Sequence, residues 1–208
     1  VITRTLARHD ALFFLDEIPL GPAVRNVARR VFGAPRGYGR PGQRLAAALT
    51  ELGPSFIKLG QALAVRADVV GEDIARDLTA LQDRLEPFAG MEARRAIEAE
   101  LGKPVAALYA SFTDRALAAA SIAQVHEATT SAGEDVVVKV LRPGIEAQFA
   151  RDLDFFAAMA GAAEAIRPNL KRLKPAEVVR RFAAWVEVEM DLRYEAAAAD
   201  ELAQNFAD

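Results

Sequence analysis

Lys139 is the residue of this chain whose type and surroundings point most directly to chemistry. It interrupts the apolar, largely β-branched run Val136–Leu141, which predicts a strand. An ammonium group inside such a strand needs an anion, because burying it without a partner carries a large free-energy cost. The position therefore predicts a phosphate or carboxylate partner for Lys139. A surface lysine on a half-exposed strand is the alternative.

A turn of very small residues precedes this lysine in the sequence. Ala118, Ala119, Ala120 and Ser121 lie between two predicted strands. Small side chains allow main-chain N–H groups to approach phosphates closely. A strand, a small-residue turn, a second strand and then a strand lysine is the order of a nucleotide phosphate-binding lobe. Because alanine is common throughout the chain, the turn is informative mainly together with Lys139.

Acidic residues are spaced along a predicted helix over residues 175–206, at Glu187, Glu189, Asp191 and Glu195. On one straight helix Asp191 and Glu195 share a face, whereas Glu189 and Asp191 point about 200° apart. This spacing predicts that Glu189 and Glu195 serve different partners. A solvated acidic helix face is the alternative.

Lys58 and Gln61 share a helical turn with Gly60, within a helix that we expect Ser55 to cap. Side chains three or four residues apart on a helix present adjacent polar groups to one partner. The alternative is a close helix crossing at Gly60 with exposed polar neighbours.

Apolar periodicity predicts the elements that position these side chains. The expected strands are residues 109–112, 122–128 and 136–141, with a hairpin turn at 131–135, and the expected helices include residues 3–18, 91–101, 145–166 and 175–206. The predicted organisation has three parts. Residues 1–42 form basic helices and a loop, 43–103 a helical block, and 104–208 a small antiparallel sheet with two long helices.

Composition excludes several classes of function. The 208 residues carry a net charge of −3, which argues against a generally basic nucleic-acid binder. The absence of cysteine excludes disulfides, thiolate zinc sites and cysteine nucleophiles, and only two histidines argue against a histidine-built metal centre. No apolar run reaches the length of a membrane-spanning helix.

Residues 21–44 contain arginines but no acidic residue: Arg25, Arg29, Arg30, Arg36, Arg40 and Arg44. Such a stretch can bind an anionic membrane surface or a phosphate-bearing partner. The favoured interpretation is a solvated helix face followed by a linker.

Taken together and in this order, the motifs resemble the UbiB family of atypical protein-kinase-like proteins of ubiquinone biosynthesis. The resemblance covers roughly residues 43–207 and rests on five segments: the KxGQ segment Glu51–Gln61, the alanine-rich loop within Ala118–His126, the strand lysine in Val137–Val140, the ExD motif Glu189–Asp191, and Glu195. Two positions depart from the family pattern, with Ala123 in place of glycine and Val137 in place of alanine.

The resemblance implies an α+β fold: a protein-kinase-like N-lobe, made of a small antiparallel sheet and an αC-type helix, behind a family-specific helical N-terminal extension. It also implies that Lys139 holds the phosphates of Mg-ATP or Mg-ADP and pairs with Glu195. The loop at residues 118–121 would cover those phosphates. Lys58 and Gln61 would guard the cleft, with Lys58 acting as a latch toward Glu189 and Asp191.

Further expectations follow from the resemblance. The C-lobe with its catalytic aspartates and main metal ligands is expected to be absent from this chain. The leading function is an atypical kinase or ATPase that supports ubiquinone biosynthesis at the cytoplasmic face of the inner membrane, where this fragment would be peripheral. A pseudokinase-like module that binds pathway lipids or organises pathway enzymes is the main alternative, and a component of the hydroxylation step is a weaker one.

Overall fold

The structure is a computed structural model that divides into two compact units. It describes residues 1–13, 23, 26–27, 30–31, 38–81, 85–166 and 168–206, except for the side chains of 166 and 168–170. The first unit, here the helical unit, combines Val1–Asp83 with Asp152–Arg180. The second, here the sheet unit, combines Arg84–Arg151 with Arg181–Asp208.

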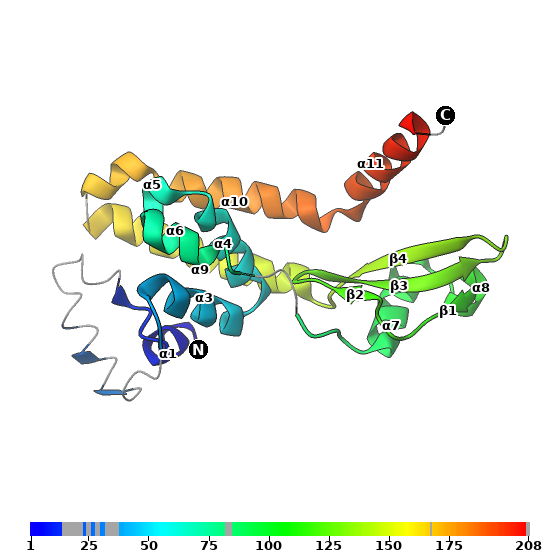
Figure 1. Cartoon of the computed structure of the whole chain (residues 1–208), viewed down its shortest axis with the longest axis horizontal. Coiled ribbons are helices and arrows are strands. Elements are labelled where there is room, and N and C mark those ends of the chain that lie inside the picture. The colour runs from blue at the N-terminus through cyan, green and yellow to red at the C-terminus, as the bar shows by residue number, and fades with distance from the viewer. Residues whose placement is uncertain are drawn as a thin grey trace. The chain divides into compact units, whose positions relative to one another are not determined.

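The helical unit is built from short helices that pack around α3 (Pro41–Leu52) and α4 (Pro54–Ala64) (Figure 1). Gly53 separates these two helices with φ +104°, a conformation that glycine adopts readily, and Pro54 then begins α4. The other elements are α1 (Ile2–Arg8), α5 (Ala67–Val70), α6 (Glu72–Leu78), most of α9 (Ile145–Ile166), the 3-10 helix η2 (Pro168–Leu173) and the start of α10 (Pro175–Met190).

Apolar side chains of α3, α4, α6 and α9 form the core of the helical unit. Leu49, Ile57 and Leu78 are almost completely buried, and Phe56 meets Phe156 edge to face with ring centroids 4.9 Å apart. This core places the polar residues of α4 on a rigid support.

The sheet unit contains a four-stranded antiparallel sheet with β3 (Ala123–Thr130) at its centre. The hairpin partner β4 (Asp135–Leu141) lies along one edge of β3, in a register that pairs Ala123 with Leu141 and Thr129 with Asp135. The strands β1 (Tyr109–Phe112) and β2 (Ala118–Ala119) pair with opposite ends of β3.

Helices cover one face of this sheet. The helices α7 (Gly90–Leu101) and α8 (Val105–Leu108) bury Ala93, Ile97 and Val105 against Val140 (Figure 1). Because successive strand residues point to opposite faces, Val138 and Val140 join this core while Val137 and Lys139 are exposed on the other face. We call the second face the open face of the sheet.

Most of the predicted elements are confirmed. The strands at 109–112 and 136–141, the hairpin turn between β3 and β4, and the helices at 91–101 and 145–166 occur within a residue or two of their predicted bounds. The grouping of elements differs from the sequence-based division, because α7 packs with the sheet whereas that division placed it in the helical block.

Three local predictions are wrong. Ser55 does not cap α4, because the chain enters that helix at Gly53 and Ser55 lies fully buried in the first turn. The helix predicted over residues 3–18 ends at Arg8, and its last apolar positions lie outside the described residues. The long helix predicted over 175–206 is interrupted at Asp191, which separates α10 from α11 (Leu192–Asn205).

Candidate functional site

Lys139 lies near the end of β4 on the open face of the sheet, and its ammonium group forms an ion pair with Glu195. Glu195 comes from the first turn of α11. The side chains are 35% and 61% exposed, so the pair is accessible to solvent. The structure thus brings together the strand lysine and the carboxylate that the family resemblance implied as its partner.

The alanine-rich turn shares the open face with this lysine. In the sheet register Ala118 on β2 pairs with Val125 on β3, and Val125 pairs with Lys139 on β4. Residues that pair across antiparallel strands point to the same face. Ala118, Val125 and Lys139 therefore form one row across three strands, with the smallest side chain at the end nearest the turn.

The turn itself is tightly held. The Ala120 main-chain N–H donates to the Ala123 carbonyl at 2.8 Å, while Ser121 is completely buried and Ile122 nearly so. The main-chain atoms of the turn therefore lie beside the row of Ala118, Val125 and Lys139. Ala119 is the last residue of β2 before the turn.

Arg142, which belongs to none of the predicted motifs, holds this turn. Its main-chain N–H donates to the Ile122 carbonyl at 2.9 Å, and its Nη2 donates to the carbonyls of Ala120 at 3.0 Å and Glu86 at 2.8 Å. The guanidinium also lies over the Phe88 ring, 5.6 Å from the centroid. The available signal was an arginine directly after the strand that carries Lys139.

A buried network supports the opposite face of the same strands. The Gln124 amide exchanges hydrogen bonds with the main chain of Phe88 at 3.0 and 3.2 Å, and its Nε2 donates to His126 Nε2 at 2.8 Å. His126 Nδ1 therefore carries the proton that is donated to the Thr113 carbonyl. Because His126 is completely buried and also stacks on Phe112, its role is structural.

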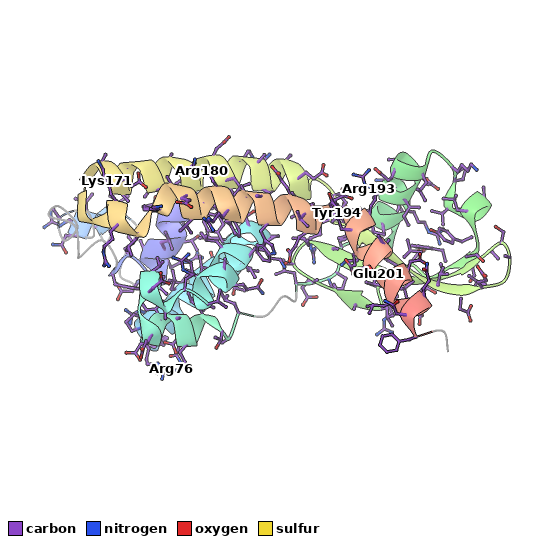
Figure 2. All side chains as sticks on the ribbon, turned by 90° about the horizontal axis from the view of Figure 1, so that it is seen from above. Arg76, Lys171, Arg180, Arg193, Tyr194 and Glu201 are labelled. Carbon is purple, nitrogen blue, oxygen red and sulfur yellow. The ribbon has the colours of Figure 1, made fainter. Side chains whose placement is uncertain are left out.

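Asp191 has a different role from the one its helical spacing predicted. It is the N-cap residue of α11, and its Oδ1 accepts a hydrogen bond from the main-chain N–H of Arg193 at 3.1 Å. The Arg193 guanidinium also donates to both carboxylate oxygens, at 2.7 and 2.6 Å, and holds the pKa of Asp191 below its usual value. Figure 2 labels Arg193 and Tyr194 at the start of α11. Glu189 is half-buried in the last turn of α10.

The KxGQ segment lies on α4 in the helical unit. Lys58 is buried, with 6% of its surface exposed, and Gln61 Nε2 donates to the Leu81 carbonyl at 3.5 Å. A Cβ atom on Gly60 would lie 2.3 Å from Leu81 Cδ1 and 2.7 Å from Leu49 Cδ1. Gly60 is therefore the close helix crossing, although its polar neighbour Lys58 is buried and Gln61 is half-buried. The latch from Lys58 to Glu189 and Asp191 would join the two units and stays a prediction.

Two arginines of the basic stretch are engaged inside the helical unit. Arg40 donates through Nε to Asp77 at 3.2 Å, and Arg44 forms an ion pair with Asp10 at 3.4 Å. Arg25, Arg29 and Arg36 lie outside the described residues. Among the helices that the structure describes, none combines the length and apolar character needed to cross a membrane.

The family model of the ABC1 atypical kinase-like domain matches residues 80–208. The chain belongs to the ABC1 atypical kinase-like family. The match includes the sheet, the alanine-rich turn, Lys139 and Glu195, so the α+β fold of the sheet unit is that of an ABC1 kinase-like N-lobe.

Curated relatives of this ABC1 chain carry the name "Probable protein kinase UbiB". The chain is 48% identical over 165 residues to the protein of Marinobacter nauticus, an alignment that covers 79% of this chain and 30% of the relative. It is 47% identical over 161 residues to that of Xylella fastidiosa, with coverage of 77% and 29%. The chain therefore spans about 30% of the length of these relatives.

Among solved structures, the complex of Rv3197 with erythromycin from Mycobacterium tuberculosis is similar to this ABC1 chain at 29% identity and a TM-score of 0.47. The match covers 90% of this chain and 44% of that one.

Proposed function

We propose that this chain is the nucleotide-binding N-lobe of a UbiB-type atypical kinase or ATPase that supports ubiquinone biosynthesis. The observation that carries the proposal is the Lys139–Glu195 ion pair, on the same sheet face as the alanine-rich turn. Family membership supports the kinase-like part of the proposal, and the similarity to proteins named UbiB supports the pathway.

The residues present fit the phosphates of ATP or ADP. Lys139 supplies a positive charge that is partly exposed, so a phosphate can approach it while Glu195 holds the other side of the ammonium group. Ala118 and Ala120 add little bulk beside this position, so main-chain groups of the turn can approach the same phosphates. A bound Mg²⁺ would neutralise phosphate charge, with most of its ligands in a C-lobe.

Glu195 orients Lys139 in this scheme. A lysine side chain has several rotatable bonds, so a fixed carboxylate reduces the number of positions that its ammonium group occupies. The carboxylate lies in the first turn of α11, whose start is fixed by Asp191. The position of α11 therefore decides whether Lys139 is held ready for a phosphate.

Lys58 regulates access to this site in our proposal, through the acids of the ExD motif. Its burial supports a defined partner, because a buried ammonium group is costly without one. Glu189 is itself half-buried in the last turn of α10. Gln61 anchors the helix that carries Lys58 through its bond to Leu81.

Thermal unfolding of the full-length protein with Mg-ATP or Mg-ADP tests the proposal. A ligand at one hundred times its dissociation constant stabilises the folded state by about 2.7 kcal/mol. We expect both nucleotides to raise the Tm of the wild type and Lys139→Ala to lose most of the shift. Lys103→Ala, which removes an exposed lysine of the sheet unit, is the matched control and should keep the shift. If neither nucleotide raises the wild-type Tm, the proposal is overturned in favour of a nucleotide-independent binding module.

A further inference from the structure

Arg142 contacts the alanine-rich turn from two directions. Its main-chain N–H binds the Ile122 carbonyl at one end of the turn, and its guanidinium binds the Ala120 carbonyl at the other. One residue thus fixes both sides of the tight reversal between Ala120 and Ala123. The main-chain contact is open to any residue except proline, whereas the contact to Ala120 uses two donors of the planar guanidinium, Nε and Nη2.

The same guanidinium reaches the segment that leads into α7. Nη2 donates to the Glu86 carbonyl at 2.8 Å, and the charged plane lies over the Phe88 ring. The main chain of Phe88 is held in turn by the Gln124 amide on β3. Arg142 therefore ties the alanine-rich turn to residues 86–88, and that segment is anchored independently to the centre of the sheet.

The environment of Arg142 differs from that of a surface arginine. Its hydrogen-bond partners are main-chain carbonyls, and burial lowers the pKa of its guanidinium. A charged group that is partly removed from water in this way needs its hydrogen bonds to offset the loss of hydration. The geometry favours arginine, since Nε and Nη2 both donate to the Ala120 carbonyl while Nη2 also donates to Glu86, and a lysine ammonium has only one nitrogen.

Arg142 is also three residues beyond Lys139 on one continuous segment. Lys139 lies within β4, and Arg142 follows directly after the strand ends at Leu141. The end of β4 therefore sets the distance between Lys139 and Arg142, the residue that holds the turn.

We infer that Arg142 is a positioning residue for nucleotide binding. It holds the alanine-rich turn at a fixed distance from Lys139 and so determines whether the site favours a nucleoside triphosphate or a nucleoside diphosphate. The inference rests on the proposed function, because it concerns the same nucleotide. Arg142 itself acts through the turn and needs no contact with a phosphate.

The test compares Arg142→Ala, Arg142→Lys and the control Arg95→Ala in the full-length protein. Arg95 is an arginine of α7 whose guanidinium contacts Met91 Sδ at 3.5 Å. Dissociation constants for Mg-ATP and Mg-ADP are measured for each variant. We expect Arg142→Ala to weaken binding about fivefold or more and to change the ratio of the two constants, a shift that corresponds to about 1 kcal/mol. Arg142→Lys should recover part of the affinity but not the ratio, and Arg95→Ala should match the wild type.

Hydrogen exchange supplies a second readout that needs no nucleotide. Amide exchange at residues 118–123 should accelerate in Arg142→Ala and stay unchanged in Arg95→Ala. Wild-type affinities and an unchanged ratio in Arg142→Ala would overturn the inference, as would unchanged exchange in the turn. If the wild type binds neither nucleotide, the proposed function fails and the positioning role fails with it, whereas faster exchange would still show that Arg142 holds the turn.

Discussion

The carboxylate of Asp191 binds Arg193 three times, through the main-chain N–H and through two nitrogens of the guanidinium. This arrangement ends α10, caps α11 and fixes the direction in which α11 leaves. Glu195 lies in the first turn after the cap and reaches Lys139 from there. Asp191 thus positions the partner of the strand lysine, because Glu195 follows this N-cap by four residues in the first turn of α11. Figure 2 labels Arg193 and Tyr194, which lie between the two.

We expect Asp191→Ala to weaken nucleotide binding several-fold in the full-length protein, because loss of the cap frees the first turn of α11 and with it Glu195. Asp191→Asn is the control, since asparagine is an equally good N-cap residue and keeps an acceptor for the Arg193 N–H. Calorimetric titration with Mg-ADP gives both affinities. Equal losses in the two variants would assign the effect to the charge of Asp191 and contradict the capping role.

Glu195→Gln separates a functional ion pair from a structural one. Exposed ion pairs stabilise folds by about 0–1 kcal/mol, so the variant should unfold within about 0.5 kcal/mol of the wild type. Nucleotide affinity should fall much further, because Lys139 loses the carboxylate that orients it. Chemical denaturation and nucleotide titration of the same preparation provide the comparison. A large loss of stability with unchanged affinity would contradict our assignment.

Gly60→Ala tests the close helix crossing on α4. Alanine is favoured over glycine in a helix by about 1 kcal/mol, but overpacking a buried contact costs about 1–3 kcal/mol. Because the new methyl group would overlap Leu49 and Leu81, we expect a lower Tm. Gly161→Ala on α9 is the control, since a Cβ atom there meets no atom within 4 Å, and it should stabilise slightly. Stabilisation by both substitutions would show that the crossing tolerates a side chain.

The predicted latch is tested by removing the charge of Lys58. Lys58→Met keeps most of the apolar stem of this buried side chain, and Lys58→Ala removes it. We expect both variants to raise autophosphorylation and to change nucleotide affinity, because the acids of the ExD motif would be released. Radiolabelled phosphate transfer by the full-length protein gives the first readout. Wild-type values for both quantities would reject the latch.

The junction of α1 and α3 should weaken in acid. Hydrogen bonds from His9 and Arg8 hold the pKa of Glu51 below its ordinary value. A depressed carboxyl pKa contributes stability above the unfolded value, about pH 4.3, and that contribution is lost as the pH falls through the folded value. Because Glu51 is partly exposed, the contribution should be only about 0.5 kcal/mol. The protection factors of the α1 amides, corrected for the intrinsic pH dependence of exchange, should fall below about pH 4.3 in the wild type and be already lower at pH 7 in Glu51→Gln. Equal pH dependence in both would assign the effect elsewhere.

Local patterns were sufficient to predict most elements of this chain. The continuous apolar, β-branched run at 136–141 predicts a strand and the helical pattern at 145–166 predicts a helix, and both predictions depend only on residues that are neighbours in the sequence. The motif order likewise predicted an ion pair between Lys139 and Glu195. Residue type, spacing and family resemblance point to both residues, and all three can be recognised in a sequence directly.

Tertiary structure decided the features that depend on partners distant in sequence. The break at Asp191 was invisible to periodicity, because an aspartate within a helical pattern is compatible with a solvated face as well as with a cap. The hold of Arg142 on the alanine-rich turn joins residues that are 22 and 56 positions apart, and nothing in the local sequence specifies those carbonyls. The choice of face for Lys139 was also tertiary, because α7 and α8 cover only one side of the sheet and leave the ammonium group on the other.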